Sequence, residues 1–68
     1  MNFNEWKQLA EEGKAEAQYN LGLMYSLGKD IPRNDPEAVK WYRLAAEQGL
    51  AQAQHNLGVM YGLSLIHI

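Results

Sequence analysis

The sequence predicts an all-α fold, an α-solenoid of antiparallel helix pairs with about four helices and a 36-residue repeat. The first observation is internal similarity: residues 10–27 return 36 positions later as residues 46–63, and 12 of the 18 aligned positions are identical. The second is composition, since alanine, glutamate, glutamine and leucine are frequent and favour helix. The third is the glycine and proline between the helical stretches. Repeats of this length are typical of solenoids, whose units bury their apolar faces against their neighbours.

Composition and charge exclude several classes of function. The chain has 68 residues, a net charge of −2 and no cysteine, so disulfides and thiolate metal sites are excluded. Its few lysines and arginines are scattered, so we expect no nucleic-acid partner. No apolar run reaches the roughly 18 residues that a membrane span needs, and no signal peptide is visible. We therefore expect a cytoplasmic protein without a membrane partner.

In a helix-pair repeat, the first helix is called A and the second B, and the predicted order here is B-A-B-A. Residues 1–14 form the end of a preceding B helix, in which Asn2 and Glu5 have the spacing of a capping box. Gly13 is expected to end this helix. Its apolar residues at helical spacing are Phe3, Trp6, Leu9 and Ala10.

Residues 15–50 form one complete repeat, whose A helix should run over residues 15–27. A glycine inside a helix costs about 1 kcal/mol relative to alanine, yet Gly22 returns as Gly58. We infer that a neighbouring helix approaches this position closely, and that Gly28 ends the helix. The apolar stripe of the helix is Ala17, Leu21, Met24 and Tyr25.

The B helix of this repeat has a clear start signal. Asp35 is expected to cap it, with Pro36 at the first helical position and Glu37 favouring the helix dipole. The helix should run to Gln48 and stop at Gly49. One face carries Ala38, Trp41, Tyr42, Ala45 and Ala46, and the other carries Glu37, Lys40, Arg43 and Glu47.

Residues 51–63 copy residues 15–27 and form the A helix of the next repeat. Residues 64–68 leave the pattern, because Ser64 stands where the repeat calls for glycine and an apolar end follows. We interpret this tail as an artefact foreign to the natural protein. The alternative is a natural end, in which Leu65, Ile66 and Ile68 would be the docking surface.

Residues that could carry chemistry do not form a catalytic or metal-binding pattern. His55 and His67 lack the further ligands that a metal site needs. Ser26 and Ser64 have no base partner, and no glycine-rich phosphate loop is present. The glutamates near the helix ends are interpreted as a solvated face, and the aromatic residues as core. We expect no enzyme, no cofactor and no metal.

The motif A-x-A-Q-x-x-L-G-x-x-Y-x-x-G, followed by a short loop and D-x-x-A-x-x-W-Y-x-x-A-A-E-Q-G, resembles the Sel1-like repeat. The resemblance covers roughly residues 5–63. The tetratricopeptide repeat is the nearest alternative, but its period is 34 residues, and here Trp41 lies in the B helix. The resembling residues are Ala15, Ala17, Gln18, Leu21, Gly22, Tyr25, Gly28, Asp35, Ala38, Trp41, Tyr42, Ala45, Ala46, Glu47, Gln48 and Gly49, and in the second copy Ala51, Ala53, Gln54, Leu57, Gly58 and Tyr61.

This resemblance implies a non-enzymatic adaptor or scaffold that binds a protein or peptide. In such a solenoid the A helices line the concave side, and the positions that do not face the core form a groove. Asn20 and Asn56 either grip a bound peptide backbone or make contacts between repeats, and both readings stay open. The expected groove residues are Glu16, Tyr19, Asn20, Leu23, Gln52, His55, Asn56 and Val59.

Two other functions remain as alternatives. The chain could be a structural terminal piece of a longer repeat array, or a regulatory segment of a repeat-containing enzyme. The apolar ends at residues 3–6 and 64–68 also predict self-association.

Overall fold

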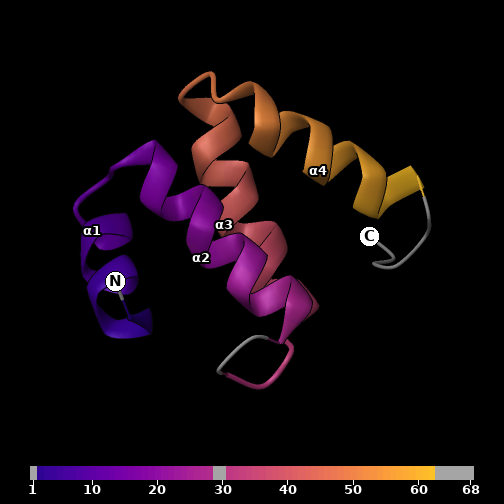
Figure 1. Ribbon diagram of the computed structural model, residues 1–68. Helices are drawn as coiled ribbons and strands as arrows, with labels where there is room; N and C mark the ends of the chain where they lie inside the picture. Colours follow the sequence, from indigo (N-terminus) through magenta and orange to yellow (C-terminus); the bar gives the residue numbers. More distant parts are fainter. Residues whose placement is uncertain (1, 29–30, 63–68) are drawn as a thin grey trace.

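The computed structural model describes residues 2–28 and 31–62, with side chains as far as Val59. Within these residues the secondary structure consists of four α-helices (Figure 1). They are α1 (Phe3–Glu11), α2 (Ala15–Leu27), α3 (Asp35–Glu47) and α4 (Ala51–Gly62). The all-α fold class and the four expected helices are confirmed. Helix α2 has the predicted bounds, and α3 begins and ends one residue before its prediction.

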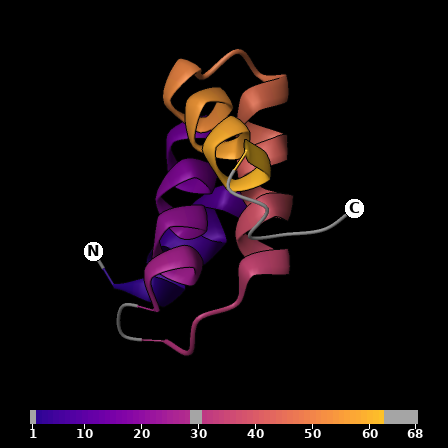
Figure 2. The same cartoon turned by 90° about the vertical axis from the view of Figure 1, so that its right-hand side faces the viewer.

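Each helix packs against the next one along the chain. Figure 1 shows α2 and α3 side by side at the centre, with α1 and α4 on opposite sides of this pair. In the view turned by 90°, α4 lies in front of the seam between α2 and α3 (Figure 2). Contacts therefore join neighbours in sequence, as expected for a solenoid.

The ends of α1 and α2 follow the sequence signals. The Asn2 side chain accepts a hydrogen bond from the Glu5 backbone N–H at 3.0 Å, and the Glu5 side chain accepts one from the Asn2 N–H at 3.2 Å. This reciprocal pair is the predicted capping box. Gly13 and Gly28 follow α1 and α2 with φ angles of +97° and +68°, the left-handed region that glycine enters without a Cβ clash.

The predicted cap of α3 is wrong by one residue. Asn34, not Asp35, is the N-cap, and its side-chain oxygen accepts a hydrogen bond from the Glu37 N–H at 3.2 Å. Asp35 is the first helical residue, and its carboxylate is held by Arg33 through two hydrogen bonds of 3.0 and 3.1 Å. Pro36 therefore lies one position deeper than expected, still within the first turn, where no intrahelical donor is required.

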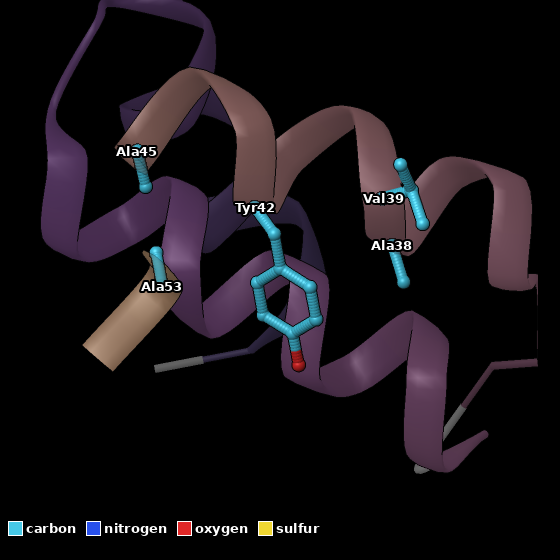
Figure 3. Packing of buried hydrophobic residues seen from close by; sticks show 5 residues of the cluster. All are labelled: Ala38, Val39, Tyr42, Ala45 and Ala53. Carbon is cyan, nitrogen blue, oxygen red and sulfur yellow. The ribbon is translucent and has the colours of Figure 1, made fainter. Parts of the chain in front are cut away.

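Tyr42 is the centre of one core cluster. Its ring points from α3 toward α2, among small residues that let the helices approach (Figure 3). A Cβ built on Gly22 would lie 2.7 Å from two ring atoms of Tyr42, so the predicted close approach at Gly22 is confirmed. The approaching group is a side chain rather than a backbone. The buried residues of this cluster are Ala38, Val39, Tyr42, Ala45 and Ala53.

A second cluster joins α1 to the α2–α3 pair. Trp41 lies here, and Phe3 meets Tyr25 edge to face with ring centroids 5.7 Å apart. The interpretation of these aromatic residues as core is confirmed for Trp41 and Tyr42, whereas Trp6 and Tyr25 are half-buried against the core. The buried residues of this cluster are Ala10, Ala17, Leu21 and Trp41.

A repeated glutamine joins consecutive helix pairs. Gln18 is only 4% exposed, and its Nε2 donates to the Ala10 carbonyl at the end of α1 over 3.1 Å. Thirty-six positions later, Gln54 Nε2 donates to the Ala46 carbonyl over the same 3.1 Å. Gln48 adds a further link, because its Nε2 donates to Gln18 Oε1 at 2.9 Å and to the Gly13 carbonyl at 2.8 Å. The junctions are thus held by side-chain amides as well as by apolar packing.

Several predicted features lie outside the described residues. They are the tail 64–68, including His67, the expected last helical residue Leu63, and the side chain of Tyr61.

Candidate functional site

A hollow opens between α2, α3 and α4, and we call it the α2–α4 hollow. Its volume is about 270 Å³. Apolar side chains from α2 and α4 form its walls, and Tyr42 of α3 contributes to its lining. The lining residues are Leu23, Ser26, Leu27, Arg33, Asp35, Tyr42, Asn56 and Val59.

Hydrogen bonds hold the polar groups of this hollow in place. Ser26 Oγ donates to the Leu23 carbonyl at 3.1 Å and lies 3.2 Å from the Tyr42 hydroxyl. A serine hydroxyl carries one proton, and the carbonyl uses it. The Tyr42 hydroxyl is therefore the donor to Ser26, and both hydroxyls are kept in fixed positions.

Tyr19 connects the hollow to the core. Its ring lies 5.9 Å from the Tyr42 ring at an angle of 41°. Its hydroxyl lies 3.5 Å from Asn56 Nδ2, which is a long hydrogen bond between α2 and α4. Two of the predicted groove positions are thus brought together.

The predicted groove residues fall into two groups. Leu23, Asn56 and Val59 line the α2–α4 hollow, and Tyr19 lies beside them. The other four do not line it. Of these, Asn20 is half-buried and its Nδ2 donates to the Glu16 carbonyl of its own helix at 2.9 Å. The remaining exposed residues are Glu16, Gln52 and His55.

The two repeated asparagines therefore have different partners. Asn20 bonds within α2, whereas Asn56 reaches across to α2. The contact of Asn56 is one between repeats, although at 3.5 Å it is long enough to be exchanged for another acceptor.

Sequence reasoning missed five lining residues of the hollow. Ser26, Leu27 and Arg33 had no assigned role in the groove, Tyr42 was assigned to the core and Asp35 to the cap. A usable signal exists only for Leu27, a large apolar residue at the end of α2 that falls outside the stripe of buried positions. Arg33 is held at the hollow by its two hydrogen bonds to Asp35. This pairing also raises the pKa of the Arg33 guanidinium.

In the described ranges 2–28 and 31–62, no three histidine, cysteine, aspartate or glutamate side chains are grouped so as to hold a metal ion. Nor does any helix in those ranges combine the length and hydropathy that crossing a bilayer would take.

Comparison with known proteins identifies the repeat. A family model described as Sel1 repeat matches residues 15–50 and 51–66. The secretory immunoglobulin A-binding protein EsiB of Escherichia coli O6:H1 is 50% identical over 45 residues, which are 66% of this chain and 9% of that protein.

Two solved structures share the fold. A Sel1 repeat protein from Oxalobacter formigenes superposes with a TM-score of 0.83 at 48% identity, covering 85% of this chain and 24% of that one. A protective antigen of uropathogenic Escherichia coli strains, described as displaying an SLR fold, gives a TM-score of 0.58 at 33% identity, covering 90% and 21%. This chain thus spans no more than about a quarter of each relative. Sel1 repeat proteins are generally protein-interaction scaffolds and typically not catalytic. The chain belongs to the Sel1 repeat family.

Proposed function

We propose that this chain is a non-enzymatic interaction module that docks an extended peptide segment of a protein partner, with an aliphatic side chain seated in the α2–α4 hollow. One observation carries the proposal. The large hydrophobic residues exposed in the described part of the chain are Leu27, at 70%, and Val59, at 42%, and both line this one hollow. Exposed apolar side chains that gather around a concavity are typical of interaction sites.

The polar groups around the hollow suit a peptide backbone. Asn56 offers both an amide donor and an amide acceptor, and its contact with Tyr19 is long. A bound peptide carbonyl can replace that contact at a shorter distance. The apolar walls would supply most of the affinity, and the amide would supply orientation.

The relatives support a protein as the partner. The name of EsiB states that it binds secretory immunoglobulin A, which is a protein. The shared stretch is a small part of that molecule, so it supports the class of partner rather than the partner itself.

A selection followed by affinity measurements tests this function. Random peptides displayed on phage are selected against the whole chain, and the dissociation constants of the selected peptides are measured for wild type and for Leu27→Gln and Val59→Gln. We expect selected peptides to share an aliphatic residue and to lose about tenfold in affinity with either variant, since a buried aliphatic anchor contributes about 1.5–3 kcal/mol.

The matched control is Arg43→Gln, because Arg43 is exposed on α3 and lines neither this hollow nor the α1–α3 cleft described below. It should leave the affinity unchanged. Peptides that bind wild type, Leu27→Gln and Val59→Gln equally would overturn the proposal.

A further inference from the structure

A second and larger concavity lies on the other side of α3, between α1 and α3, with α2 beneath it. We call it the α1–α3 cleft, and its volume is about 670 Å³. Two consecutive residues of α3 line different concavities: Tyr42 lines the α2–α4 hollow, and Trp41 lines the α1–α3 cleft. No groove residue predicted from the sequence lines this cleft.

Trp41 has an unused hydrogen-bond donor. The side chain is 5% exposed, and its Nε1 is buried without an acceptor in the part of the chain that the structure describes. An indole N–H can only donate, and buried indole groups ordinarily find an acceptor. Because Nε1 is itself buried, a ligand acceptor in this cleft reaches it only after neighbouring side chains move, and it would then satisfy a group that the described part of the fold leaves unsatisfied.

Two ammonium groups border the same cleft. Lys40 Nζ lies 4.9 Å from the centroid of the Trp41 ring, a cation–π distance, and Lys7 lines the cleft from α1. Among residues 2–28 and 31–62 the ion pair is that of Arg33 with Asp35, so neither lysine nitrogen lies within ion-pair distance of a carboxylate there. The cleft is thus lined by two lysines and by the tryptophan that carries the unpaired N–H.

The two ends of the cleft are acidic. Glu37 lines it from the first turn of α3, and Glu11 lines it from the last residue of α1. Because α1 and α3 run in the same direction (Figure 1), these carboxylates lie toward opposite ends. Burial, and after it the charge of Glu37, raises the pKa of Tyr25, which also lines the cleft. Along its length the charge of the cleft is therefore negative, then positive, then negative.

We propose that the α1–α3 cleft is a second docking site, which takes a peptide segment bearing a carboxylate flanked by basic residues. The carboxylate lies between Lys7 and Lys40 and accepts from Trp41 Nε1, while the flanking cations face Glu11 and Glu37. The alternating charges of the cleft are complementary to such a segment. They repel a segment in which a basic residue is flanked by acidic ones, which makes the site selective. This site is independent of the α2–α4 hollow, because the two have different lining residues. An experiment that refutes one proposal leaves the other unaffected.

The experiment follows the indole resonance of Trp41 in the ¹⁵N-labelled whole chain. The probe is the capped peptide acetyl-Lys-Gly-Asp-Gly-Lys-amide. The control peptides are acetyl-Lys-Gly-Asn-Gly-Lys-amide and the charge-reversed acetyl-Asp-Gly-Lys-Gly-Asp-amide. We expect the aspartate peptide to move the Trp41 indole signal downfield in a saturable way, with Trp6 as the internal reference and little response to either control.

Variants assign the contacts, with affinities measured by calorimetry. Lys7→Gln and Lys40→Gln should each weaken binding by about two- to fivefold, the range of a single exposed ion pair. Trp41→Phe keeps an aromatic ring but removes the five-membered ring that carries the N–H, so it should weaken binding by about tenfold. Arg43→Gln, which removes a positive charge outside both concavities, should leave this binding unchanged.

Three results would overturn the proposal. One is a Trp41 signal that does not move with the aspartate peptide at millimolar concentration. Another is an equal shift with the asparagine or charge-reversed peptide, and the third is an affinity that Trp41→Phe and both lysine variants leave unaltered.

Discussion

Gly22 and Tyr42 are in contact so close that the glycine cannot accept a side chain: a Cβ on Gly22 would meet the Tyr42 ring at 2.7 Å. Gly58 occupies the same place in the next copy, yet among the described side chains, which end at Val59, a Cβ there would meet nothing within 4 Å. The two glycines thus have the same position in their repeats but different packing, so substitutions at them can be compared directly.

Alanine substitutions at these glycines should have opposite effects. Gly58→Ala should raise the free energy of unfolding by up to about 1 kcal/mol, the difference in helix propensity. Gly22→Ala gains the same propensity but must displace a buried ring, and overpacking costs about 1–3 kcal/mol, so we expect a net loss. Urea unfolding followed by circular dichroism measures both. Equal effects of the two substitutions would show that the Tyr42 contact does not govern this position.

The glutamine at the junction of α1 and α2 should be important for stability. Gln18→Leu removes the donor to the Ala10 carbonyl and the acceptor used by Gln48, and leaves both groups without that partner. We expect a loss of about 1–3 kcal/mol in the free energy of unfolding. Gln54→Leu is the control, because the equivalent bond to Ala46 is exposed and water can replace it. A larger loss for Gln54→Leu would contradict the role of burial.

The cap of α3 gives a test between two adjacent residues. Asn34→Ala removes the acceptor for the Glu37 N–H and should cost about 1 kcal/mol of stability. Asp35→Ala removes an exposed pair with Arg33, and such pairs contribute about 0–1 kcal/mol. Thermal unfolding should therefore rank Asn34→Ala as the less stable variant. The reverse order would restore Asp35 as the cap.

Tyr25 should make stability depend on alkaline pH. Burial and the charge of Glu37 raise its pKa above the ordinary value of 10.0. In the unfolded chain the phenol ionises near 10, whereas in the folded chain it stays protonated longer. The folded state therefore keeps its full stability below about pH 10, and its free energy of unfolding falls as the pH rises through the pKa of Tyr25 in the folded chain.

Tyrosinate absorbance of the folded chain should contain a late-titrating component that Tyr25→Phe removes. Glu37→Gln should lower the pKa of Tyr25 while leaving its burial unchanged. A titration that is the same with and without Tyr25 would refute the assignment.

The open face of α4 should promote self-association. Light scattering at tens of micromolar should give a mass above that of one chain, because Val59 is an exposed apolar side chain and no described side chain lies within 4 Å of a Cβ built on Gly58. Gly58→Glu should lower this mass. Gln52→Glu adds the same charge at an exposed position of the same helix and should leave it unchanged. A monomer at this concentration would contradict the prediction.

The helices could be predicted because their signals are local. Asn2 with Glu5 starts α1, and Gly13 and Gly28 end α1 and α2, each through bonds within a few residues. The close approach at Gly22 could be predicted because a costly glycine that recurs needs a packing reason. Only the identity of the approaching group, Tyr42, required the structure.

The rest depended on which contacts the side chains make, both near and far in sequence. Asn34 and Asp35 are both good caps, and the choice between them depends on Arg33 engaging the carboxylate of Asp35. The α2–α4 hollow depends on how α4 leans away from the end of α2, so periodicity found Leu23 and Val59 but not Leu27. The α1–α3 cleft was missed because Trp41 has the pattern of a core residue, and a pattern does not report an unpaired N–H.

The bond from Gln18 to the Ala10 carbonyl, repeated from Gln54 to Ala46, has an evolutionary consequence. A side chain that binds a backbone carbonyl requires little of the side chain at the residue that it reaches. Neighbouring units therefore need not adapt to each other before they can be joined. Unequal recombination can duplicate, delete or exchange such units within a gene while each new junction still closes, and surface residues are then free to diverge from one unit to the next.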